Sequence, residues 1–243
     1  MKNKIVIDPV TRVEGHGKVT IHLDDQNNVT DSFFHIVEFR GFEKFVQGHP
    51  YWEAPVMVQR LCGICPVSHH LAAAKAIDRI VGLEPDELSI TAQKIRKLLH
   101  YGQIFQSHAL DFFYLASPDL LFGFRSGPEM RNVVGVAMEY PELAKKGILM
   151  RKFGQEIIKM IAGKKIHGIS TTPGGVHKKI TVRERDYFLN GKDIPSIDTM
   201  ISWSQEIIDF MKLYHRQNAH WLNEFATYPS GHLGLVNAKN GYL

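Results

Sequence analysis

Cysteine is scarce in this sequence, and long apolar stretches are missing. Only Cys62 and Cys65 occur among 243 residues, which is too few for a disulfide scaffold and favours a reducing compartment, most simply the cytoplasm. No apolar run approaches the roughly 20 residues of a membrane-spanning helix. The opening stretch MKNKIVID is too polar for a secretory signal peptide. We therefore expect neither a disulfide-rich secreted domain nor a membrane span.

A large excess of one charge and the common nucleotide-binding motifs are also missing. The net charge is +4, from 29 basic and 25 acidic residues spread along the chain, so nucleic acid is not an expected partner. Gly15 and Gly17 precede a predicted strand, and the third glycine of a dinucleotide-binding loop is not there. Neither a phosphate-binding loop nor an HExxH motif occurs. Any nicotinamide chemistry is therefore expected on another chain.

Hydrophobic periodicity predicts a short β region followed by helices. Residues 18–25 and 29–39 predict strands on either side of a turn rich in Asp and Asn. Predicted helices cover 66–81 (with Gly82 just past the end), 87–116 (closed by Pro118), 141–162, a segment that begins with a capping box at Thr181 and Glu184, and 196–226. The predicted fold is α+β and mostly α, with an N-terminal antiparallel β-meander followed by a long-helix bundle. We predict a single domain over residues 1–243, β-rich in 1–40 and helical in 41–230. Residues 231–243 predict a strand and an Asn-Gly turn, the start of a hairpin.

The CxxC pair leaves several kinds of site open. Structural zinc needs four ligands, to which His69 and His70 could contribute, and a dithiol redox pair would also suit the predicted helix start at Pro66. Two thiolates are soft ligands for nickel, copper, zinc or iron. The free N–H groups of the helix start and the nearby Arg60 are expected to favour thiolate over thiol. His69, one turn after Cys65, is placed to donate a hydrogen bond to a metal-bound sulfur. Metal binding, redox chemistry and simple burial remain open on these residues alone.

Five segments taken together resemble the large, catalytic subunit of nickel–iron hydrogenases. They are DPVTRVEGHGKV at 8–19, EFRGFEKFVQG at 38–48, RLCGICPVSHH at 60–70, QSHALDFFYLASPD at 106–119 and GKKIHGISTTPGGV at 163–176. The sequence looks most similar to cytoplasmic NAD-linked bidirectional enzymes, followed by the methyl-viologen-reducing type that feeds heterodisulfide reductase. The resemblance implies reversible heterolytic oxidation of H2, with electrons passing to an iron–sulfur small subunit. Further partners would be electron-transfer subunits, either an NAD-linked diaphorase or a heterodisulfide reductase type.

The resemblance also implies roles for five residues. Cys62 matches a terminal nickel ligand, and Cys65 matches a ligand that bridges nickel and an iron carrying CO and cyanide. Glu14 matches the carboxylic acid that relays the proton. Glu43 matches a ligand of a structural magnesium, and His69 matches a histidine that forms a hydrogen bond near the bridging thiolate.

The sequence departs from the family pattern in one respect. The family carries a second CxxC near the end of a longer chain, whereas this sequence has no third cysteine. The resemblance therefore covers only the N-terminal half, as expected of an incomplete gene or a split subunit. We expect the isolated chain to be aggregation-prone and unable to assemble a working centre. Alternatives are a non-catalytic fragment that only binds partner subunits, a relative of the quinone-reducing subunit of respiratory complex I, and a zinc or dithiol protein.

Overall fold

The computed structural model describes residues 3–11, 13–84, 86–224, 231 and 233–234. The chain divides into two compact units, Met1–Pro195 and Ser196–Leu243, and each is described by itself. The single domain over residues 1–243 stays a prediction, and the hairpin predicted in 231–243 lies almost wholly outside the described residues. Within these described ranges, no helix combines the length and apolar content that crossing a bilayer requires.

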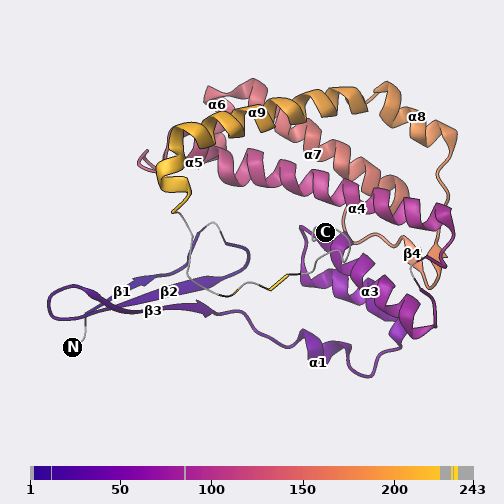
Figure 1. Cartoon of the computed structure of the whole chain (residues 1–243), viewed down its shortest axis with the longest axis horizontal. Helices are drawn as coiled ribbons and strands as arrows, with labels where there is room; N and C mark the ends of the chain where they lie inside the picture. Colours follow the sequence, from indigo (N-terminus) through magenta and orange to yellow (C-terminus); the bar gives the residue numbers. More distant parts are fainter. Residues whose placement is uncertain (1–2, 12, 85, 225–230, 232, 235–243) are drawn as a thin grey trace. The chain divides into compact units, whose positions relative to one another are not determined.

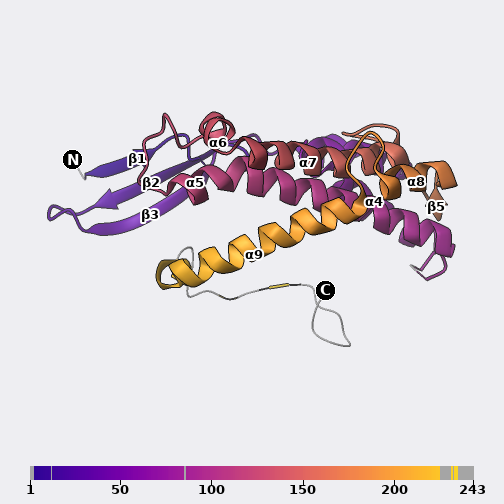
Figure 2. The same ribbon diagram turned by 90° about the horizontal axis from the view of Figure 1, so that it is seen from above.

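The first unit begins with a three-stranded antiparallel sheet. Its strands are β1 (Lys4–Ile7), β2 (Gly17–Leu23) and β3 (Val29–Ile36), which pair in the order β1-β2-β3 (Figure 2). Asp24 closes the β2–β3 turn, because its Oδ1 accepts the backbone N–H groups of Gln26 and Asn28 at 2.8 Å each. The predicted N-terminal meander is confirmed, with β1 as an additional strand.

Four short helical segments lead from the sheet to the first long helix. They are α1 (Phe42–Val46), η1 (Tyr51–Glu53), α2 (Ala54–Met57) and η2 (Val58–Leu61), and α3 (Pro66–Ile80) follows. Pro66 opens α3, where its missing N–H costs no hydrogen bond. Gly82 follows the helix with φ +82°, a backbone conformation that favours glycine. The helix predicted from Pro66 to just before Gly82 is confirmed.

The next helical region does not end where the sequence predicts. It consists of α4 (Ile90–Leu110), the π-helical turn η3 (Asp111–Ala116) and α5 (Ser117–Phe122). The expectation that Pro118 closes the helix is wrong. Pro118 lies in the first turn of α5, where no intrahelical N–H bond is needed, so the chain continues as helix beyond it.

Two long helices form the centre of the first unit. α6 (Val133–Glu139) precedes α7 (Pro141–Ala162), and α7 lies side by side with α4 (Figure 1). Glycines allow the close approach: a Cβ on Gly102 would lie 2.8 Å from Ile157 Cγ2, and one on Gly154 would lie 2.7 Å from the Gly102 carbonyl oxygen. Leu99 and Ile158 are fully buried in this unit. The predicted fold class, α+β and mostly helical, is confirmed.

The remaining elements are short or belong to the second unit. β4 (Thr171–Thr172) and β5 (Gly175–Val176) form a small hairpin, and α8 (Val182–Asn190) begins with the predicted capping box of Thr181 and Glu184. The second unit contains α9 (Ile197–Leu222), which Ser196 caps. Among the described residues of α9, Met200 is buried, whereas Ile201 is 61% exposed.

Candidate metal centre

The two cysteines lie at the ends of one short loop at the start of α3. Cys62 follows η2 and its backbone N–H donates to the Gln59 carbonyl at 3.4 Å, while Cys65 is the N-cap of α3. The Sγ atom of Cys62 accepts the backbone N–H groups of Ile64 and Cys65, at 3.4 Å each. Both thiols are free and half-buried. The loop therefore presents two sulfur atoms from one turn of chain.

The electrostatics of the loop differ from the sequence expectation. Burial, together with the neighbouring Cys62 and the Glu14 carboxylate, raises the pKa of the Cys65 thiol to about 11. The expected preference for thiolate is therefore wrong for Cys65, because these effects outweigh the helix N-terminus. A cation bound at the sulfur atoms would reverse this preference, because it would stabilise the thiolates against the nearby carboxylate. Two adjacent, partly accessible thiols fit a soft metal ion.

Two glutamines of α4 hold the loop between the cysteines. The side-chain amides of Gln103 and Gln106 donate to the Ile64 carbonyl oxygen, at 2.8 and 2.9 Å. Both side chains are buried, and the Oε1 atom of Gln103 is buried without a partner. Sequence reasoning missed this contact, although two amides three residues apart on the apolar face of a helix are a readable signal.

The other predicted site residues take less specific positions. His69 is half-buried in the first turn of α3, and within the described residues its side chain makes no hydrogen bond. Glu43 faces solvent in α1 and pairs with Arg40 at 2.7 Å. A backbone N–H and the Arg40 guanidinium lower the pKa of Glu43. The roles implied for His69, Glu43 and Glu14 stay predictions.

The segment 163–176 meets the cysteine loop through Arg60. The Nη1 atom of Arg60 lies 3.1 Å from Nδ1 of His167, so two segments that resemble the same family lie together in the fold. His167 has φ 55°, an unusual backbone conformation for a residue with a side chain. Among the described residues, the cysteine loop included, no three His, Cys, Asp or Glu side chains gather where they could hold a metal ion. The cysteine pair is thus a two-donor set.

Comparison with known proteins agrees with this reading of the loop. A family model described as nickel-dependent hydrogenase matches residues 40–121, which include both cysteines, and one described as HoxL-like matches residues 4–39.

The chain is also similar to curated hydrogenase subunits. It is 49% identical over 240 residues to the beta subunit of the NAD-reducing hydrogenase HoxS of Cupriavidus necator, covering 97% of this chain and 49% of that relative. It is 44% identical over 233 residues to one of the subunits of the F420-non-reducing hydrogenase vhu of Methanococcus voltae, covering 96% and 54%. The chain spans about half the length of the curated relatives that it matches.

Solved structures support the same relationship. A crystal structure of an NAD+-reducing NiFe-hydrogenase in the H2-reduced state superposes with a TM-score of 0.89 and 53% identity, over 97% of this chain and 51% of that chain. A reduced Ni-Fe-Se hydrogenase from D. vulgaris Hildenborough superposes with a TM-score of 0.61 and 25% identity, over 85% and 46%. The fold and the sequence therefore agree on one family.

Proposed function

Because this chain belongs to the nickel-dependent hydrogenase family, we propose that it is the N-terminal half of a hydrogenase large subunit that interconverts H2 with protons and electrons. The observation that carries the proposal is the Cys62–Cys65 loop, two soft donors on one turn before a helix, inside the segment that matches the family. Cys62 would be a terminal nickel ligand. Cys65 would bridge nickel to an iron with CO and cyanide ligands.

The residues of this chain would handle protons at the loop. A nickel–iron centre, when bound, supplies the Lewis-acid and redox chemistry by which H2 is split heterolytically. Cys62 and Cys65 bind metal as thiolates, so each releases its proton on binding. The Glu14 carboxylate is close enough to Cys65 to raise its pKa, which supports Glu14 as the group that accepts protons there and passes them on. We assign His69 the hydrogen bond that orients the bridging sulfur.

The remaining metal ligands and the partner subunits would come from outside these 243 residues. Two thiolates are half of a four-thiolate site, so the remaining ligands would come from the other half of the large subunit. Glu43, exposed on α1, would bind a magnesium ion together with groups of that half. The partners would be electron-transfer subunits of the NAD-linked or heterodisulfide reductase type, together with an iron–sulfur small subunit. We place the protein in the cytoplasm, and its similarity to an NAD-reducing enzyme supports this location.

The test uses the full chain produced together with the other half of a large subunit and with an iron–sulfur small subunit. We expect the purified complex to contain nickel and iron by elemental mass spectrometry and to reduce a dye with H2. Cys62→Ser or Cys65→Ser should remove nickel and activity, whereas Val134→Ser on an exposed helix face should change neither. Zinc in place of nickel, or full nickel loading of the serine variants, would contradict the proposal. A complex that assembles without metal would instead favour the non-catalytic binding fragment.

A further inference from the structure

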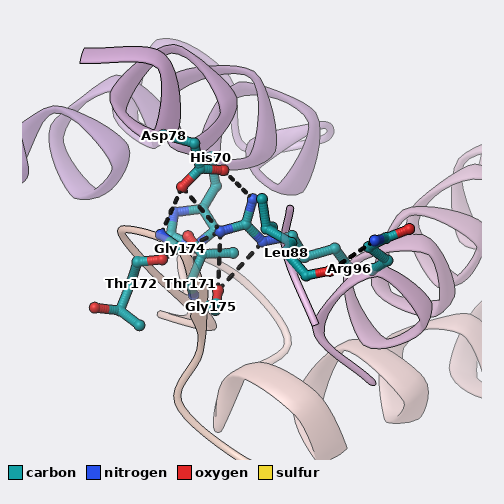
Figure 3. A network of polar contacts seen from close by, with 9 residues as sticks. His70, Asp78, Leu88, Arg96, Thr171, Thr172, Gly174 and Gly175 are labelled. Carbon is teal, nitrogen blue, oxygen red and sulfur yellow. Dashed lines mark hydrogen bonds and ion pairs between the residues drawn. The ribbon is translucent and has the colours of Figure 1, made fainter. Parts of the chain in front are cut away.

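A buried histidine, next in the sequence to the predicted site residue His69, joins two distant parts of the first unit. The side chain of His70 is 1% exposed, and Figure 3 shows it between α3 and the segment that carries Thr171. Its Nδ1 atom lies 2.7 Å from the Pro55 carbonyl oxygen, which can only accept. Its Nε2 atom accepts the backbone N–H groups of Ser170 and Thr171 at 3.3 Å each and lies 2.9 Å from Thr171 Oγ1. These partners require a neutral imidazole with its proton on Nδ1.

A buried ion pair holds the adjacent hairpin turn. The carboxylate of Asp78 on α3 and the guanidinium of Arg96 on α4 are 5% and 10% exposed and bind each other (Figure 3). Arg96 also donates to the carbonyl oxygens of Thr172 and Gly175, at 3.1 and 2.9 Å. The Oδ1 atom of Asp78 accepts the Gly174 N–H at 2.8 Å. Both charges are therefore satisfied, and both bind the β4–β5 turn.

A short chain of contacts connects this network to the first cysteine. The Pro55 carbonyl that accepts the His70 N–H also accepts the side-chain amide of Gln59 at 3.2 Å. Gln59 is 1% exposed, and its backbone carbonyl oxygen accepts the backbone N–H of Cys62 at 3.4 Å. The hydrogen bonds thus run without a break from Thr171 to the start of the cysteine loop.

We propose that His70, Asp78 and Arg96 are positioning residues that hold the β4–β5 turn on α3 and α4. By doing so they fix the position of the Cys62 backbone at the start of the cysteine loop. In this arrangement the segment 163–176 supplies no metal ligand but sets the separation of the two sulfur atoms before metal arrives. The inference rests on the proposed function of the cysteines as metal ligands. Groups that orient the ligands of a metal commonly change its affinity by about 10- to 100-fold when they are removed.

The chemistry of His70 suits a fixed support. Burial lowers the pKa of His70 below its ordinary value, so it stays neutral at physiological pH. A protonated ring would place a second N–H against the two backbone donors of Ser170 and Thr171, so the network selects one protonation state and one tautomer.

The experiment measures binding of Cd2+, a single thiophilic ion, to the full 243-residue chain by its sulfur-to-metal charge-transfer absorption. We expect His70→Leu to weaken the Cd2+ affinity by about tenfold or more. Ile158→Ala, in the core of α7 and outside the network, lowers stability without this contact and should leave the affinity within about twofold of wild type. Equal affinities of the His70→Leu and wild-type chains would overturn the inference. So would an equal loss in the two variants, because that would indicate a general effect of destabilisation.

Two conservative variants separate a positioning role from simple loss of packing, and they carry the test if His70→Leu does not fold. His70→Asn keeps a donor toward Pro55, whereas His70→Gln keeps an acceptor toward Ser170 and Thr171. Each should restore part of the affinity, and wild-type affinity in both, with Asp78→Asn also unaffected, would overturn the inference.

The proposed metal ligands are tested separately by Cys62→Ser. If Cys62→Ser binds Cd2+ as tightly as wild type, the assignment of the cysteines as ligands fails. If only the network variants bind normally, the positioning role fails and the ligand assignment stands.

Discussion

The two glutamines that hold the Ile64 carbonyl allow a quantitative test of how the cysteine loop is stabilised. Gln103 and Gln106 donate to the same oxygen at 2.8 and 2.9 Å, and both are buried. They differ in one respect, because the Oε1 atom of Gln103 is buried with no hydrogen-bond partner. Replacing each with leucine, singly and together, removes one donor or both while keeping a side chain of similar size.

The expected changes in the free energy of unfolding follow from that difference. Loss of one neutral hydrogen bond costs about 1 kcal/mol, and an unsatisfied buried polar atom costs roughly 1–3 kcal/mol. Gln106→Leu should therefore destabilise the chain by about 1 kcal/mol. Gln103→Leu removes a bond and an unsatisfied oxygen together, so its effect should be near zero or stabilising. The double variant leaves the Ile64 carbonyl without either donor. Its loss of unfolding free energy should exceed the sum of the two single losses by about 1–3 kcal/mol.

The assay is equilibrium urea unfolding of all four chains, with the slope of the transition compared to exclude a change in the denatured state. Gln93→Leu is the matched control, because Gln93 lies on the same helix and also donates to a backbone carbonyl, that of Leu88 at 2.7 Å, but is exposed. It should change stability by less than about 0.5 kcal/mol. Additive single effects, or a cost for Gln103→Leu as large as that of Gln106→Leu, would refute the reasoning.

Three further expectations concern other contacts. Thr181→Ala removes the capping box of α8 and should cost about 0.5–2 kcal/mol in urea unfolding; no change would mean that the cap does not stabilise α8 in solution. Asp78→Ala leaves the buried Arg96 charge unpaired and should cost about 3–5 kcal/mol, whereas the apolar pair Asp78→Leu with Arg96→Met should cost much less in the same assay. Because burial lowers the pKa of His70 from 6.5, the unfolded chain binds the proton more tightly. The stability from neutral His70 is therefore complete above pH 6.5 and is lost as the pH falls toward the folded-state pKa, and His70→Gln should lack this dependence in unfolding measured from about pH 7.5 to 5.5.

Local signals in the sequence predict most of the helices well. Pro66 and Gly82 mark the ends of α3 because each has a strong positional preference, and the Thr181–Glu184 capping box predicts the start of α8. Pro118 was misleading because proline stops a helix only beyond its first turn, and a π-helical turn before Ser117 lets a new helix start there. Local signals in the sequence do not indicate this π-helical turn, a rare kind of helix.

The site was only partly predictable for a similar reason. The cysteine spacing and the family segments identify Cys62 and Cys65, but the raised pKa of Cys65 depends on burial and on Glu14, which is far away in the sequence. The contacts of His70 with residues about 100 positions later, including Thr171, arise from tertiary structure alone. The adjacent pair of histidines gave no local reason to assign the buried support to the second one.

The exposed edge of strand β3 makes the yield of folded complex depend on how fast the chain meets a partner. β3 is an edge of the three-stranded sheet among the described residues, and its apolar side chains include Phe33, Phe34 and Ile36, which are 50–77% exposed. An open edge with apolar side chains is a template for pairing with another chain. Pairing between identical chains accelerates with the square of their concentration, whereas capture by a partner in excess depends on it only linearly. Slow synthesis in the presence of a partner should therefore raise the fraction of folded complex, and fast synthesis of the chain alone should raise the fraction that aggregates.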